Sequence, residues 1–171
     1  ADMTINEIGI APRPFQDPHP PLYGGFTMSV STALFWSRYG GTPIVLSDNL
    51  DFCEQLWRTY REEAPKHGIE KQKGHEAAWG GIAICAETDA EAEAQFEDME
   101  WFWGQWANQF GQGMPLKLVG SPDTISRQIE EAHDVLGFDE CFFLIPQGIH
   151  SSEQINHSLG LLADRVMPRF Q

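Results

Sequence analysis

Short apolar segments alternate with amphipathic helical patterns along most of the chain. The apolar segments, bounded by turn residues, lie at residues 22–23, 42–47, 79–86 and 140–146. Fully apolar runs of this length are typical of buried parallel strands. Between them, apolar residues recur with the spacing of a helix that has one buried face. The predicted order is β-α-β-α-β-α-α-β-α, an α/β fold with a parallel sheet and right-handed crossovers.

Capping residues mark where these helices begin. Ser121 is expected to cap one helix with Pro122 at its first position, and Ser47 or Asp48 another. Two capping boxes are expected, at Thr88 with Glu91 and at Ser151 with Gln154. Glycines at 40, 68 and 137 are expected to end the helices before them. The segment 69–75 is polar without a period and predicts a loop.

Residues 12–41 combine a proline-stiffened segment, a very short strand, the diglycine Gly24-Gly25 and a helix opened by hydroxyl residues. Ser29 is the expected N-cap, and Thr32 follows three residues later. The backbone N–H groups near Met28 and the hydroxyls beside them would face an anion such as a phosphate. A plain N-cap without a ligand is the alternative that this local pattern leaves open.

Two other features carry candidate chemistry. An aromatic block at 101–106 contains Trp101, Phe102, Trp103 and Trp106, and it either lines a pocket or belongs to a core or interface. His150 follows the last strand, where barrel active sites are built, and is a candidate general base. Solvation at a helix start is the alternative reading of this histidine.

Charge and cysteine content exclude several classes of function. The chain has 171 residues, with 25 acidic and 11 basic side chains and a formal net charge of −14. This balance argues against nucleic-acid binding and against an anionic membrane surface. The three cysteines lack metal-ligand or disulfide spacing, so we expect buried apolar thiols and no metal site. The sequence has no apolar run of membrane-spanning length and no signal-peptide pattern, which leads us to expect a cytoplasmic protein.

The run P-R-P-F-Q-D-P-H-P-P-L-Y-G-G and the hydroxyl-rich helix start after it resemble the central segment of bacterial-luciferase-like flavin monooxygenases. The segments G-S-P-D-T-I-S-R-Q-I-E-E-A and V-M-P-R-F are similar to the end of these barrels. The resemblance implies reduced FMN, supplied by a separate reductase, and oxygenation of a small organic substrate. It implies cofactor contacts at Gly25, Met28, Ser29 and Thr32. Later strand ends would contribute through Ser47, Trp79 and Gln147, and no catalytic residue is assigned.

The chain is short for this family, because a complete TIM barrel needs about 250 residues and eight strands. We expect about four (β/α) units, the carboxyl-terminal half of such a barrel, with residues 1–21 as a proline-rich arm and 22–171 as one domain. Four barrel strands alone would leave two open edges and an apolar inner face. We therefore expect self-association, an amino-terminal half-barrel partner or a relaxed sheet. The alternative function is a non-catalytic flavin- or phosphate-binding, or purely structural, half-barrel that dimerises.

Overall fold

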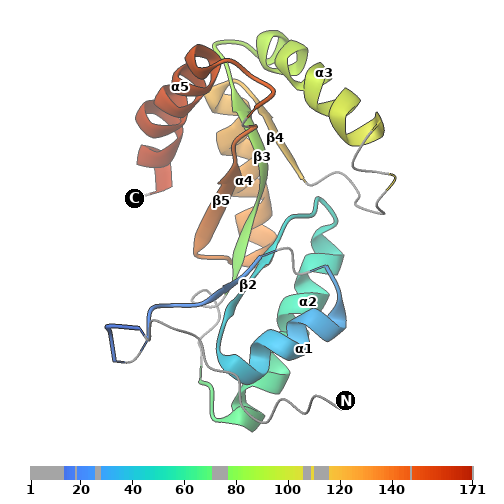
Figure 1. The fold of residues 1–171 in the computed structure, drawn as a ribbon, viewed down its shortest axis with the longest axis vertical. Helices are drawn as coiled ribbons and strands as arrows, with labels where there is room; N and C mark the ends of the chain where they lie inside the picture. Colours follow the sequence, from blue (N-terminus) through green and yellow to red (C-terminus); the bar gives the residue numbers. More distant parts are fainter. Residues whose placement is uncertain are drawn as a thin grey trace, which may run out of the picture.

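Strands and helices alternate along the computed structural model, which describes residues 14–17, 19–25, 28–70, 77–105, 109, 116–146 and 148–170 (Figure 1). The strands are β1 (Tyr23–Gly24), β2 (Thr42–Val45), β3 (Ala78–Cys85), β4 (Lys117–Gly120) and β5 (Glu140–Leu144). The α-helices are α1 (Val30–Tyr39), α2 (Leu50–Glu63), α3 (Asp89–Gln105), α4 (Pro122–Leu136) and α5 (Ser152–Leu161). A 3-10 turn, Ala64–His67, follows α2, and the chain closes with a π turn, Leu162–Val166, and a 3-10 turn, Met167–Phe170.

All strand pairs in the sheet are parallel, as predicted, and β3 is its central strand. One side of β3 pairs first with β2, at Ile44↔Ala78, and then with β4, from Ile82↔Lys117 onward. Its other side pairs with β5 from Ala78↔Glu140 to Ile82↔Leu144. The predicted arrangement of about four parallel (β/α) units is confirmed, although the predicted element order omits one strand, β4, with the sequence K-L-V-G. The sheet is therefore a curled half-barrel whose helices lie between successive strands.

The two glycines of β3, Gly80 and Gly81, permit close contacts with neighbouring backbone. Leu116, just before β4, enters between two strands: its N–H donates to the Leu46 carbonyl at 3.3 Å, and its carbonyl accepts from the Ile82 N–H at 2.7 Å. A Cβ on Gly81 would lie 2.0 Å from the Leu116 carbonyl oxygen. On Gly80 it would lie 1.9 Å from the Phe142 carbonyl oxygen. Only glycine therefore lets β3 carry neighbours on both sides at this point.

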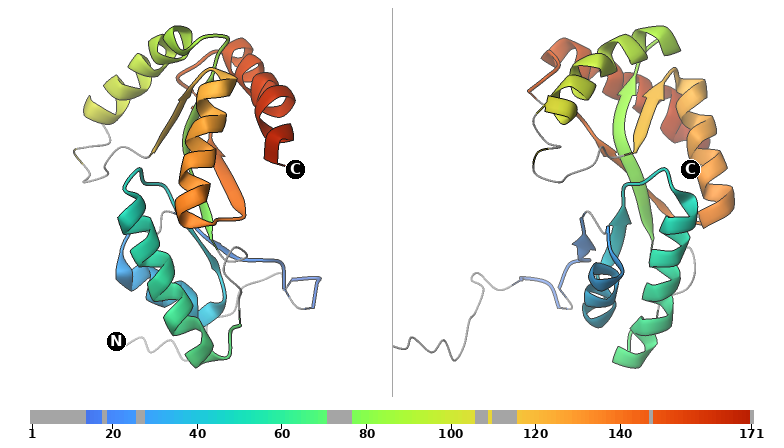
Figure 2. Two further views of the ribbon diagram at one scale, coloured as in Figure 1. Left: turned by 180° about the vertical axis from the view of Figure 1, so that it is seen from behind. Right: turned by 90° about the vertical axis from the view of Figure 1, so that its right-hand side faces the viewer.

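Alternate residues of β3 face two different sets of helices. Trp79, Ala83 and Cys85 join a buried cluster with residues of α2, α4 and the carboxyl-terminal helix. Ile82 and Ile84 join a second cluster beneath α3. The two views in Figure 2 show α2 and α4 running along the sheet and α3 crossing its upper end. Because successive side chains of a strand point to opposite faces of the sheet, β3 contributes to both buried clusters.

The lower part of the inner face is covered by the chain's own side chains. Ile44, Leu46 and Ala78 are buried there against the half-buried Phe142 and Leu144. Tyr23 of β1 reaches across the curved sheet to β5, where its ring lies 5.7 Å from that of Phe142 and its hydroxyl donates to Glu140 Oε1 at 2.8 Å. The hydrogen bond to Glu140, with some burial, raises the pKa of Tyr23 above its usual value. The first and last strands are not hydrogen-bonded neighbours, yet they meet because the sheet is curled.

Most predicted helix boundaries are confirmed. Ser121 caps α4, Ser151 and Gln154 form the expected capping box, and Gly40 and Gly137 end α1 and α4 with φ of 69° and 61°. The prediction for α2 is wrong, because Asn49 is its cap: the Asn49 side chain accepts from the Phe52 N–H at 3.0 Å. The Ser47 hydroxyl instead accepts from the Asn49 N–H at 3.2 Å.

The three cysteines are all free. Cys53 and Cys85 are buried in the core, as predicted, and Cys141 is half-buried on β5. Burial raises the pKa of Cys53 and Cys141 to about 12 and that of Cys85 to about 11, so the thiols stay protonated. In the part of the chain that the structure describes, no helix is long and apolar enough to cross a membrane.

Candidate functional site

The turn that opens α1 has the geometry expected from its sequence. Ser29 is the N-cap, with extended backbone angles of −158° and 153°, and its hydroxyl accepts from the Thr32 N–H at 3.2 Å. The same hydroxyl lies 2.9 Å from the hydroxyls of both Ser31 and Thr32. Three hydroxyls therefore gather at the amino end of one helix, directly after the strand β1.

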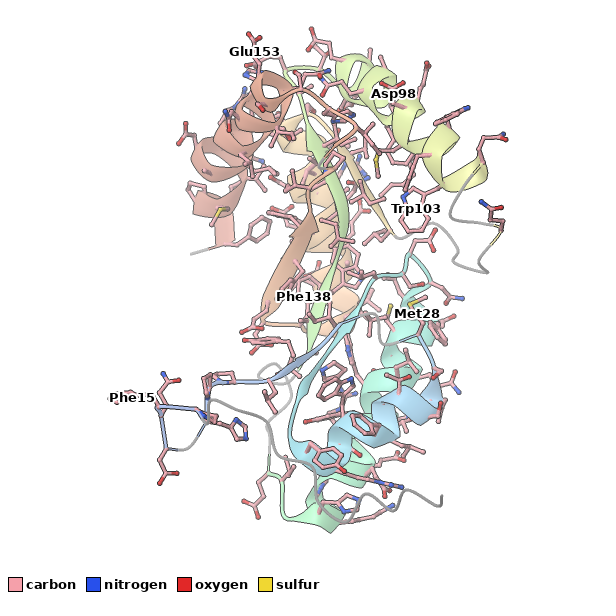
Figure 3. The ribbon with its side chains drawn as sticks, in the orientation of Figure 1. Phe15, Met28, Asp98, Trp103, Phe138 and Glu153 are labelled. Atoms are coloured by element: carbon pink, nitrogen blue, oxygen red, sulfur yellow. The ribbon has the colours of Figure 1, made fainter. Side chains whose placement is uncertain are left out.

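The two other predicted contacts lie between β1 and this cap. Gly25 follows β1 in open space, since a Cβ there would meet no atom within 4 Å. Met28 is 50% exposed and marks the start of α1 in Figure 3. Residues 26 and 27 lie outside the described residues. All four predicted positions, Gly25, Met28, Ser29 and Thr32, therefore lie between the end of β1 and the first turn of α1, with Gly25 and Met28 exposed and Ser29 and Thr32 half-buried.

The start of α1 differs in charge from the other described α-helices. Its first turn has no acidic residue, whereas α2, α3, α4 and α5 each carry at least one there. A helix amino end carries partial positive charge from its unpaired N–H groups, which favours an anion. In this strongly acidic chain, α1 alone among these five helices lacks an acidic side chain in its first turn.

The start of α4 shows what an anion does at such a turn in this fold. Ser121 and Thr124 have the same spacing as Ser29 and Thr32, and Asp89 places a carboxylate over them. Asp89 Oδ1 accepts from the Ser121 N–H at 2.7 Å, and Oδ2 accepts from the Thr124 hydroxyl at 3.0 Å. The hydrogen bond from the Ser121 backbone, with those of the two side chains, lowers the pKa of Asp89. The turn thus stabilises a negatively charged oxygen pair.

Trp79, another predicted contact, has a structural role instead of facing a ligand. Trp79 stands at the amino end of β3, is 2% exposed and stacks on Phe138 at 5.2 Å. Its indole N–H donates to the Ser47 carbonyl at 3.0 Å. The expected ligand contact of Trp79 is therefore wrong, because its side chain is buried in the cluster between the sheet and helices α2 and α4. Gln147 lies outside the described residues.

His150 anchors the segment after β5. Its Nε2–H donates to the Gln95 carbonyl of α3 at 2.8 Å. A carbonyl can only accept, so this nitrogen carries the proton. The histidine ties α3 to the segment after β5, which gives it a positioning role.

A hollow of about 730 Å³ lies between the last turns of α3 and the carboxyl end of β5. Trp101, Phe102 and Trp103 of the aromatic block line it together with residues after β5, including Ile145 and Ile149. Trp106 lies outside the described residues. The aromatic block was the sequence signal for this hollow, but nothing in the sequence paired it with β5.

The fold is shared with several solved enzymes. No protein-family model and no curated protein matches the chain. Monooxygenase RslO1 from Streptomyces bottropensis is 18% identical, with a TM-score of 0.75 over 94% of this chain and 51% of that one. The oxygenating constituent of 3,6-diketocamphane monooxygenase from Pseudomonas putida, solved with FMN, is 18% identical, with a TM-score of 0.68 over 82% of this chain and 46% of that one.

A third similar structure is the coenzyme F420-dependent tetrahydromethanopterin reductase from Methanopyrus kandleri. It is 15% identical, with a TM-score of 0.55 over 85% of this chain and 50% of that one. At these identities the comparisons show a common fold. The chain spans about half the length of each of these three proteins.

Proposed function

We propose that this chain is the carboxyl-terminal half of an FMN-dependent, luciferase-like monooxygenase that oxygenates a small organic substrate with reduced flavin and oxygen. The observation that carries the proposal is the likeness of nearly the whole chain to solved monooxygenases, one of them in complex with FMN. The resemblance of residues 12–41 to the same family supports it independently of the fold.

The start of α1 is the proposed site of the FMN phosphate. Ser29 and Thr32 offer hydroxyls, and the free N–H groups before the first helical hydrogen bonds offer donors. The carboxylate of Asp89 on the matching turn of α4 supports the fit, because a phosphate presents the same kind of oxygens. When bound, reduced flavin supplies the electrons for oxygen activation, and this chain supplies binding and orientation.

The remaining side of the site is proposed to come from an amino-terminal half-barrel, a separate segment or chain that completes the sheet. Among the described residues, β1 pairs with β2 alone and β5 with β3 alone, so each has an open edge. Cys141 and Phe143 of β5 remain half-buried beside this edge. Parallel strands with open edges are seldom left uncovered in barrel folds. A second copy of this chain is the other proposed cover, and a separate reductase is the proposed source of reduced FMN.

One observation favours the alternative, a non-catalytic flavin-binding or structural half-barrel that dimerises. Part of the inner face is already covered at its lower end, where Ile44, Leu46 and Ala78 are buried. A fragment that depends on its missing half would expose this region, whereas a self-sufficient module would bury it. In that case this chain would have no catalytic role.

Native mass spectrometry and flavin absorbance of the purified protein test the proposal together. We expect retained or titratable FMN and an assembly larger than one copy. Turnover of an aldehyde or aromatic substrate with a flavin reductase, after addition of the missing half, would separate the monooxygenase from a binding module. A compact monomer that binds no FMN would contradict both the cofactor and the association.

A further inference from the structure

The hollow beneath α3 is built unlike a gap left by core packing. Ile82, which is buried, and Leu144, which is half-buried against the same clusters of the inner face, form its floor. Trp101 and Trp103 of α3 form one wall, and Ile149 after β5 forms part of the opposite one. The volume of about 730 Å³ lies within the range of small-molecule sites, roughly 300–1,000 Å³.

The aromatic wall is placed for ring contacts with a ligand. The Trp101 side chain is 69% exposed. An aromatic side chain of this size contributes most to stability or binding when it is buried against another group. The rings of Phe102 and Trp103 lie 6.1 Å apart at 84°, an edge-to-face pair within the wall that α3 provides. Figure 3 shows Trp103 below α3, on the side toward the body of the molecule. An aromatic ligand would cover the exposed indole without disturbing the core under it.

The charge around the hollow selects against anions. Asp98 is its only charged lining residue among the described ones, and Glu97 and Glu100 are exposed on the same helix. The nearest cation on β4, Lys117, is already engaged: it lies 3.6 Å from Glu93, 3.4 Å from Glu100 and 3.8 Å above the Phe96 ring. No described lining side chain therefore offers a positive charge to a carboxylate or phosphate.

We propose that this hollow binds an uncharged aromatic small molecule, and that it holds the substrate of the proposed oxygenation. The choice of ligand class follows from the apolar floor, the two tryptophans and the acidic rim. The role as substrate site rests on the proposed function, whereas the binding itself is independent of flavin.

Calorimetric titration of the protein without flavin tests the binding, with 1-naphthol as the uncharged probe and 1-naphthoate as its anionic counterpart. We expect saturable binding of 1-naphthol at one site per chain and at least about tenfold weaker binding of 1-naphthoate, because of repulsion by Asp98. Asp98→Asn should narrow that difference. Absence of 1-naphthol binding, or equal affinities for the two probes, would overturn the proposal.

Two variants locate the bound probe. Trp101→Ala removes an exposed ring, so folding should be retained while 1-naphthol binding weakens about five- to tenfold. Phe35→Ala is the matched control, since Phe35 is 50% exposed on α1 and does not line the hollow. Equal losses in the two variants would place the probe elsewhere.

A parallel FMN titration keeps this inference separate from the proposed function. Binding of 1-naphthol without any binding of FMN would contradict the proposed monooxygenase function and support the aromatic site. Binding of FMN without 1-naphthol would do the reverse. Where both bind, 1-naphthol affinity should persist at saturating FMN, and competition between them would overturn the substrate role.

Discussion

The starts of α1 and α4 are two versions of the same turn. In each, a serine N-cap accepts from the backbone N–H of a threonine three residues later. At α4, the carboxylate of Asp89 lies on the backbone N–H of Ser121 and the hydroxyl of Thr124. At α1, the hydroxyls bond to one another, and the first turn contains no acidic side chain.

The surroundings of the two turns also differ, because the α4 turn is crowded and the α1 turn is exposed. Gly120, just before the α4 cap, has φ of 150°, and a Cβ there would lie 2.9 Å from Asp89 Oδ1 and 2.7 Å from Thr124 Cγ2. That turn is closed around its own anion. The α1 turn is open, with exposed Met28 before it and free space at Gly25. The turn of α4 therefore holds a carboxylate of the chain itself, whereas the matching turn of α1 holds none.

Giving α1 its own carboxylate should have the largest effect on binding. Ser29→Asp retains a good cap and places a negative charge where the phosphate is proposed to bind. We expect FMN affinity to fall at least about thirtyfold, or roughly 2 kcal/mol, from repulsion between like charges. Thermal stability should hold or rise slightly, because an anion suits a helix start. Isothermal titration and thermal unfolding measure the two effects.

Ser29→Asn is the matched control for that substitution, since asparagine caps a helix without charge. Its loss of FMN affinity should be much smaller. Undiminished FMN binding in Ser29→Asp would place the phosphate elsewhere.

Removing hydroxyls should have an intermediate effect that separates the two turns. Ser29→Ala and Thr32→Val should each weaken FMN binding by about 1–2 kcal/mol, as expected for one charge-assisted hydrogen bond. Thr124→Val should leave FMN binding unchanged and lower the melting temperature, because it removes the hydroxyl that holds Asp89. If Ser29→Ala reduced stability alone, the plain N-cap would be the correct account of α1.

The smallest expected effect is a pH dependence at α4. The folded-state pKa of Asp89 is lowered, so its contribution is present above the unfolded value of about 3.9 and is lost as the pH falls through the folded value. Wild type should exceed Asp89→Asn in melting temperature at pH 6, and the gap should narrow at pH 3. An equal gap at both pH values would mean that the carboxylate charge contributes nothing.

Local features of the fold were predictable because their causes lie within a few residues. Ser121 with Pro122, and Ser151 with Gln154, specify helix starts through bonds that span three residues. Strand β4 was missed because its four residues acquire a role only when Leu116 enters between Leu46 and Ile82. Likewise, Tyr23 and Glu140 are 117 residues apart, and no local pattern pairs them.

In the candidate site too, contacts between near neighbours in sequence were predictable, and contacts between distant segments were not. Ser29 was predictable as a cap because its partner, Thr32, is a near neighbour. Trp79 was wrongly expected to face a ligand, since its burial depends on contacts with Phe138 and the Ser47 carbonyl, which lie far from it along the chain. The aromatic block allowed a pocket as one of two alternatives, but the other side of the hollow could not be predicted because Ile149 comes from a separate segment.

The most direct test of the proposed phosphate contact at the start of α1 compares FMN with riboflavin, which lacks the phosphate, in titrations of the wild-type protein. The account predicts that FMN binds at least about tenfold more tightly, and that Ser29→Asp removes most of this difference. Equal affinity for the two flavins, or binding of neither, would contradict a phosphate contact at the start of α1.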